Sequence, residues 1–229
     1  MFTLIPAFKY GWQEMHKKPW TFLLLTLLFS LSGISNSFMM KDVIFSEEMT
    51  LVQFLEAFPP NFALWMSITS LALICVSFLV VTFILAGLRG IQPMTYLRMK
   101  IKRFPLYFLT MILKMLAIGI GLFFFIIPGL VLFLAFYFVE YLIIDRDMPL
   151  IESFRESWNI TKGFRVGIFF FEVNIFIIGT ILAFPQNLWP DTMITYAIIV
   201  LLNVIWLPIS WNAQGWIYQF VSEHSKTGN

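Results

Sequence analysis

The chain has 229 residues, of which 59% are hydrophobic and 12% charged, and its formal net charge is +2. A soluble domain has about 25% charged residues, so this composition excludes a water-exposed globular domain. The near-neutral charge gives no sign of a nucleic-acid partner. The mean hydropathy of +0.84 instead predicts an all-α integral membrane protein whose main partner is the lipid bilayer.

Two surface helices are predicted from a shared pattern. Residues 4–13 and 150–159 both read Leu-Ile-x-x-Phe-(Lys/Arg)-x-x-Trp-(Gln/Asn), which places apolar residues on one helical face. We expect amphipathic helices over residues 3–18 and 149–162, lying in the cytoplasmic interface. Each is interpreted either as a simple lead-in to a span or as part of a duplicated unit. Duplication would give a parallel pseudo-repeat about an axis along the membrane normal, pairing span one with five and two with six.

Six apolar stretches are long enough to cross a bilayer core of ~30 Å, which needs roughly 20 helical residues. They cover residues 20–38, 62–88, 105–127, 129–144, 166–184 and 193–211. Only Pro128 and Gly129 interrupt the apolar run from 105 to 144, and a tight turn is expected there. A five-span alternative fuses the two stretches on either side of this turn.

The orientation is predicted from the Lys and Arg residues of the short connections. In a six-span arrangement they fall on one side, which places both termini in the cytoplasm. These cations are Lys9, Lys17, Lys18, Arg89, Arg98, Lys100, Lys102, Arg103, Arg146, Arg155, Lys162, Arg165 and Lys226. The other side holds Lys41 with Asp42, Glu47, Glu48, Glu56 and Asp191. The five-span alternative would move the third basic connection to the outside.

Three ionisable residues lie inside predicted spans, where such groups are costly and are candidates for a functional site. They are Lys114, Glu140 and Glu172. Lys114 precedes the expected turn by about 21 Å of helix and Glu140 follows it by about 18 Å, so the two should meet at similar depth. We expect an ion pair between them, with snorkelling of Lys114 or protonation of Glu140 as the alternatives. Glu172 is expected to be an interior or near-interfacial acid.

A basic connection between the second and third spans is a candidate contact for anionic lipid head groups. It contains Arg89, Arg98, Lys100, Lys102 and Arg103. The same charges also follow from topology alone, so both interpretations remain open.

No constellation for catalysis, metal binding or nucleotide binding is found. His16 and His224 have no ligand partner at useful spacing, and Cys75 is the single cysteine. No phosphate-binding loop, dinucleotide fingerprint or serine-nucleophile motif is present. We therefore expect no cofactor, no metal and no enzymatic activity.

Residues 128–163 carry a resemblance to a known family. Pro128-Gly129-Leu130 opens a span, which ends in Tyr141-Leu142-Ile143-Ile144-Asp145-x-Asp147-Met148 and is followed by Ser153-Phe154-Arg155-x-Ser157-Trp158-x-x-Thr161. This stretch resembles the YciC-like family of small bacterial inner-membrane proteins, and is similar to the membrane domain fused to some glycerophosphodiester phosphodiesterases. The resemblance implies six spans in a bacterial plasma membrane and no assigned reaction. Where the fusion exists, catalysis belongs to its soluble partner domain.

Two functions of different classes follow. The first is a non-enzymatic scaffold, partner-binding subunit or membrane-homeostasis factor. The second is a small transporter or permease-like protein that uses its intramembrane charges. A polar cavity that reaches Lys114 and Glu140 would favour the second.

Overall fold

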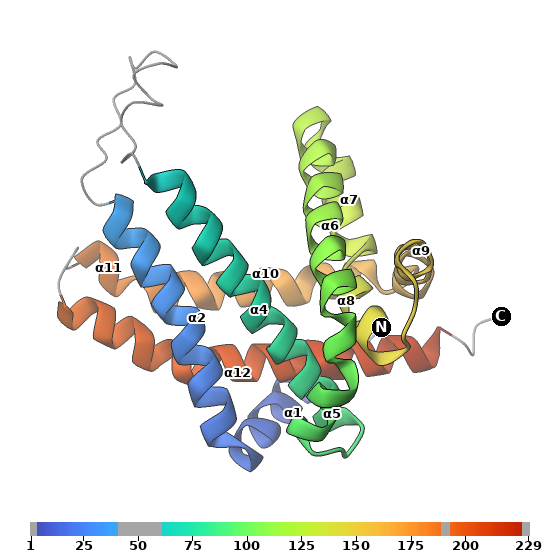
Figure 1. Cartoon of the computed structure of the whole chain (residues 1–229), viewed down its shortest axis with the longest axis horizontal. Coiled ribbons are helices and arrows are strands. Elements are labelled where there is room, and N and C mark those ends of the chain that lie inside the picture. The colour runs from blue at the N-terminus through green and yellow to red at the C-terminus, as the bar shows by residue number, and fades with distance from the viewer. Residues whose placement is uncertain (1–3, 41–60, 189–192, 226–229) are drawn as a thin grey trace.

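The computed structural model describes residues 4–40, 61–188 and 193–225, and for residues 31–40 and 186–187 only the backbone (Figure 1). The acidic side predicted from residues 41–56 and Asp191, and Lys226 in the tail, lie outside these ranges. Every regular element within the ranges is helical, so the predicted all-α class is confirmed. The helices are α1 (Leu4–Lys17), α2 (Pro19–Met40), α4 (Phe62–Leu88), α5 (Pro93–Lys100), the 3-10 turn η1 (Ile101–Arg103), α6 (Phe104–Phe124), α7 (Ile126–Ala135), α8 (Val139–Asp145), α9 (Leu150–Thr161), α10 (Arg165–Ala183), α11 (Pro185–Leu188) and α12 (Met193–His224).

Five helical stretches are long and apolar enough to cross a membrane, so the chain is a multi-pass membrane protein. They are Phe62–Leu88, Pro93–Phe124, Ile126–Asp145, Arg165–Ala183 and Met193–His224. The predicted first span coincides with α2, but only Pro19–Ser30 of that helix is described with its side chains. The sixth span therefore stays a prediction.

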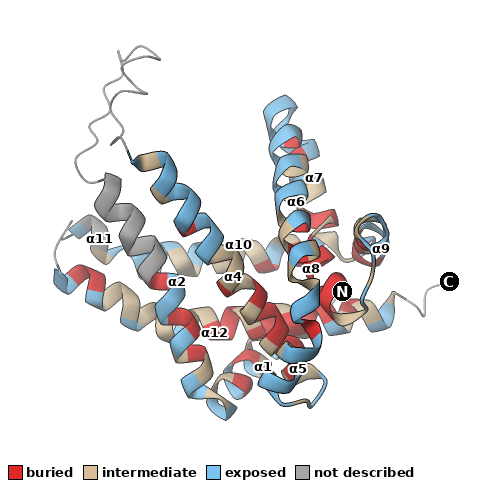
Figure 2. Ribbon diagram, viewed as in Figure 1, coloured by how far each residue is buried: buried red, intermediate tan, exposed pale blue. Residues whose placement is uncertain are grey.

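The long helices diverge from a common base. In Figure 1, the pair α2 and α4, the hairpin of α6 and α7, and the pair α10 and α12 point away from one another. We call the opposite end, which holds α1, α5, α8 and α9, the basal end. Buried residues concentrate there, while much of the surface further out on the long helices is exposed (Figure 2).

The tip of the hairpin of α6 and α7 is strongly apolar. Residues 123–127 read Phe-Phe-Phe-Ile-Ile and are 67–86% exposed. Exposing so much apolar surface to water would be unfavourable, so this tip is suited to a lipid environment.

The hairpin between α6 and α7 turns at Phe125, so the predicted turn at Pro128-Gly129 was wrong by about one helical turn. Phe125 is extended, with φ −158° and ψ 139°. Pro128 fits inside the first turn of α7 because no intrahelical hydrogen bond requires its missing N–H there. Gly129 serves close packing instead: a Cβ added to Gly121 would lie 2.9 Å from the Gly129 Cα.

The predicted fourth span is two helices rather than one. Residues 136–138 form a non-helical turn between α7 and α8. Ser157 of α9 satisfies the freed backbone, since its hydroxyl donates to the Ala135 carbonyl at 2.8 Å and accepts from the Phe138 N–H at 3.3 Å. Thr161 donates a longer bond of 3.4 Å to the same carbonyl. Ser157 and Thr161, which belong to the stretch that carries the family resemblance, thus stabilise the break between α7 and α8.

The two similar surface helices pack differently. α1 buries Ala7, Gly11 and Glu14, and a Cβ on Gly11 would lie 2.2 Å from the carbonyl oxygen of Ile209 in α12. α9 buries its small polar face and leaves Ile151 80% exposed. The parallel pseudo-repeat therefore remains a prediction from the sequence pattern.

Candidate functional site

A polar cavity of about 230 Å³ lies among α4, α6, α7, α8, α10 and α12, and we call it the central cavity. It contains Lys114, Glu140 and Glu172, so all three ionisable residues selected from the sequence line one space. The full lining is Ser77, Val81, Tyr107, Lys114, Phe133, Tyr137, Glu140, Tyr141, Glu172 and Gln214.

Lys114 and Glu140 form the ion pair expected from their depth. The Lys114 Nζ lies 2.7 Å from the Glu140 Oε1, and the two side chains are only 16% and 8% exposed. A charged pair that is this well buried is destabilised strongly when one partner is removed, because the other charge is left uncompensated.

Glu172 reaches the cavity from α10 and is held by neutral groups. The Tyr137 hydroxyl donates to its Oε1, and the Gln214 amide nitrogen lies 3.5 Å from the same oxygen. The cavity therefore contains two carboxylates and one ammonium, and the ammonium is already paired with Glu140. This balance favours a ligand that carries positive charge.

Five polar lining residues were not selected from the sequence as site candidates: Ser77, Tyr107, Tyr137, Tyr141 and Gln214. A buried tyrosine hydroxyl usually has a hydrogen-bond partner, and Tyr107 indeed pairs with the Ser77 hydroxyl. The signal in the sequence that could have indicated them was the presence of three tyrosines in otherwise apolar runs. Their partners could not be identified because they lie on helices distant in the sequence.

The broken helix lies directly beside the cavity, because Tyr137 belongs to the turn at residues 136–138. Non-helical backbone at membrane depth is tolerated only where protein buries it or where it lines a cavity. In transporters such breaks typically accompany the substrate site.

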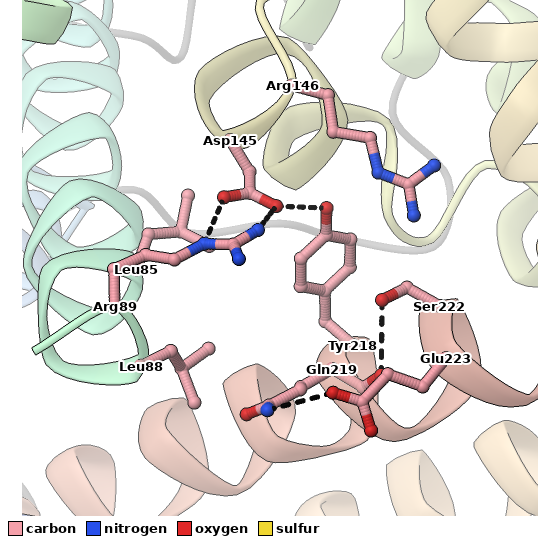
Figure 3. A pocket seen from close by; sticks show the side chains of 9 residues that line it. All are labelled: Leu85, Leu88, Arg89, Asp145, Arg146, Tyr218, Gln219, Ser222 and Glu223. Carbon is pink, nitrogen blue, oxygen red and sulfur yellow. Dashed lines mark hydrogen bonds and ion pairs between the residues drawn. The ribbon is translucent and has the colours of Figure 1, made fainter.

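A second polar centre lies at the basal end, where Asp145 joins three helices (Figure 3). Arg89, at the end of α4, donates from Nε to Oδ1 at 2.9 Å and from Nη2 to Oδ2 at 2.6 Å. The Tyr218 hydroxyl of α12 donates to Oδ2 at 2.9 Å. Paired N–H donors of this kind give a charge-assisted interaction with defined geometry.

Asp147 makes the neighbouring contacts. Its carboxylate accepts from Lys100 at 2.7 Å and from Arg103 at 3.0 Å, and its backbone is left-handed at φ 54°. Partial burial raises the pKa of the Asp147 carboxyl, but the Lys100 and Arg103 contacts outweigh it and lower the pKa below its ordinary value. Asp145 and Asp147, the two acids of the stretch that carries the family resemblance, thus bind cations of the basic connection between α4 and α6.

This pairing accounts for three of the five basic residues proposed as lipid contacts: Arg89, Lys100 and Arg103. Arg98 and Lys102 are exposed. Lipid head-group contact by any of the five stays a prediction.

A cavity of about 440 Å³ adjoins Asp145, and we call it the basal cavity (Figure 3). Its lining is Leu85, Leu88, Arg89, Asp145, Arg146, Tyr218, Gln219, Ser222 and Glu223. Arg146 also donates to Glu156 of α9 at 2.8 Å. Across residues 4–40, 61–188 and 193–225, no three His, Cys, Asp or Glu side chains gather closely enough to hold a metal ion.

Comparison with known proteins gives one family match. A family described as a domain of unknown function, DUF7847, matches residues 61–208 of the 229. The match runs from the start of α4 to Pro208 within α12, and so includes Lys114, Glu140 and Glu172. No curated protein and no solved structure gives a significant match.

Proposed function

Because the chain belongs to the DUF7847 family, whose description assigns no role, we propose a function from its own central cavity. The protein is a small permease-like transporter that binds a small solute carrying a cationic group. The observation that supports this is the convergence of Lys114, Glu140 and Glu172 on one cavity beside a broken helix.

The chemistry of the lining indicates the class of ligand. Within the described part of the chain, the hydrogen-bond donors to Glu172 are the neutral groups of Tyr137 and Gln214, so its carboxylate is available to an incoming ammonium or similar cation. Tyrosine hydroxyls and the Gln214 amide supply both donors and acceptors for polar parts of the same molecule. At about 230 Å³ the cavity is smaller than drug-sized sites of roughly 300–1,000 Å³, which favours a small amine or zwitterion.

The remaining features of the proposal come from the sequence. The positive-inside rule and α2 support six spans with both termini in the cytoplasm, so that the basal end faces the cytoplasm. The YciC-like resemblance supports a bacterial plasma membrane. The proposed role is non-enzymatic: the cavity residues bind and move a solute and do not convert it.

A scaffold or membrane-homeostasis role is the second candidate. Its support is the exposed apolar edge of α9, where Ile151 is 80% exposed and Trp158 is also exposed, facing lipid or a membrane partner. α1 gives less support, because its small residues are buried against α12.

A ligand-stabilisation screen tests the binding step. The purified protein is heated with a panel of small amines, zwitterions, anions and neutral sugars, and its melting temperature is followed. A ligand at 100 times its dissociation constant should add about 2.7 kcal/mol of stability. The proposal expects a shift with amines or zwitterions that Glu172→Gln removes and Glu152→Gln, an exposed α9 control, retains. Shifts only with anions, or none with any compound, would contradict it and leave the scaffold role.

A further inference from the structure

Three helices, α4, α8 and α12, contribute residues to both the central and the basal cavity. On each helix, the residue facing one cavity and the residue facing the other lie four positions apart, which is about one helical turn. The pairs are Val81 and Leu85 on α4, Tyr141 and Asp145 on α8, and Gln214 and Tyr218 on α12. The two cavities therefore follow one another along a single line between these helices.

Three aromatic rings in mutual contact connect the linings of the two cavities. The Tyr141 ring, which lines the central cavity, stacks on the Tyr218 ring of the basal cavity with centroids 5.1 Å apart. The Phe138 ring lies 5.6 Å from that of Tyr218 and 6.0 Å from that of Tyr141. All three residues are buried, and we call them the ring layer.

Asp145 fixes the position of one ring. Its carboxylate accepts the Tyr218 hydroxyl while it is bound by Arg89, so the ring layer is attached to both α8 and α4. The Asp145 side chain is 3% exposed, whereas that of Arg89 is 56% exposed. Water can therefore reach Arg89, and it competes with Asp145 for the guanidinium at this exposed end of the contact.

We infer that the ring layer is a gate between the two cavities and that the Arg89–Asp145–Tyr218 contacts hold it closed. The inference rests on the proposed function, because it makes the basal cavity the vestibule through which the solute of the central cavity enters or leaves. When Arg89 releases Asp145, the carboxylate that accepts the Tyr218 hydroxyl is no longer held against the end of α4, and the Tyr218 ring can rotate into the basal cavity. That space, of about 440 Å³, is large enough to receive it.

Thiol accessibility tests the gate without any measurement of transport. In a Cys75→Ser background, Gln214→Cys reports on the central cavity and Ser222→Cys on the basal cavity. A membrane-impermeant maleimide is applied from the basal side of oriented vesicles. We expect rapid labelling at position 222 and slow labelling at position 214. Adding Asp145→Asn should speed labelling at 214 by about tenfold, the size of effect expected when a closed state loses one stabilising contact.

Two further variants keep the test decisive. Asp147→Asn breaks the neighbouring ion pairs but holds no ring, so labelling at 214 should not change. Tyr218→Phe keeps the ring and loses only its hydrogen bond, so it should speed labelling even if Asp145→Asn is poorly folded. Equal labelling at 214 in the parent, Asp145→Asn and Tyr218→Phe would overturn the gate, as would an equal increase with Asp147→Asn. A protein that shows the gated labelling but binds none of the screened solutes would retain the gate and lose the proposed function.

Discussion

The Lys114 ammonium lies 2.7 Å from the Glu140 carboxylate, and the pair joins α6 to α8 at the edge of the central cavity. One pair of charges thus fixes the geometry of the cavity, while Glu172 faces the same space without an ammonium bound directly to it. Structural support and ligand binding are assigned to different acids, so they can be tested separately.

Breaking this ion pair should destabilise the protein. We expect Lys114→Ala and Glu140→Ala each to cost about 3–5 kcal/mol, the usual loss when one partner of a buried pair is removed. The swap of Lys114→Glu with Glu140→Lys should recover much of this loss, because it restores opposite charges at the same positions. Unfolding in detergent, followed by circular dichroism, measures the effect. Strictly additive damage in the swap would show that the two residues act independently.

The hairpin of α6 and α7 should not tolerate a methyl group at its glycine contact. A Cβ on Gly121 would lie 2.9 Å from the Gly129 Cα, so we expect Gly121→Ala to cost about 1–3 kcal/mol through overpacking. Gly119 on the same helix has nothing within 4 Å of such a Cβ, which makes Gly119→Ala the matched control. Alanine favours a helix interior over glycine, so the control should be neutral or stabilising. Equal melting temperatures for the two variants would contradict the close contact.

Ser157 should stabilise the protein through the broken helix. Ser157→Ala leaves the Ala135 carbonyl and the Phe138 N–H without their side-chain partner, at an expected cost of about 1–3 kcal/mol. Ser153→Ala is the comparison, because the Ser153 hydroxyl donates to the Leu150 carbonyl within its own helix and not to the backbone of the break. Chemical unfolding of the two variants gives the difference. A larger loss for Ser153→Ala would show that the break is held by other contacts.

The contacts of Asp147 predict that part of the folding stability is lost at acid pH. Its pKa is lowered in the folded protein, so it contributes stability above the unfolded pKa of about 3.9. That contribution is lost as the pH falls through the lower folded pKa. Asp147→Asn should therefore reduce the melting temperature at pH 6, and the difference from the parent should shrink toward pH 3. Asparagine tolerates the left-handed backbone at this position, so backbone strain does not confuse the comparison. Because the Asp147 side chain is about half exposed, the effect should be modest, and a difference that grew on acidification would refute it.

The sequence predicted the membrane class, most helix bounds and the Lys114–Glu140 contact, because hydropathy and helical rise act over short distances along the chain. The turn at Phe125 and the break at residues 136–138 were not predicted. Each depends on a tertiary contact, the packing of Gly121 against Gly129 in one case and the Ser157 hydroxyl in the other. Pro128 and Gly129 indicated the region of the hairpin turn but not the residue at which the chain reverses.

The basal contacts and the cavities were missed for the same reason. Asp145 and Asp147 stood out as part of a motif, and Arg89 and Lys100 as part of a basic connection, but nothing in the order of residues indicated that they pair. Gln214 reaches Glu172 from a helix 42 positions further along the chain. Such cavities arise where helices converge, and single-helix patterns carry no information about that convergence.

Solute uptake by the purified protein in liposomes tests the central claim most directly. A radiolabelled small amine or zwitterion chosen from the binding screen should accumulate inside vesicles that contain the parent protein and the Glu152→Gln control. Vesicles with Glu172→Gln should show no uptake above empty liposomes, although this variant keeps the Lys114–Glu140 ion pair. Uptake that Glu172→Gln leaves unchanged, or no uptake of any cationic or zwitterionic solute by the parent protein, would contradict the account.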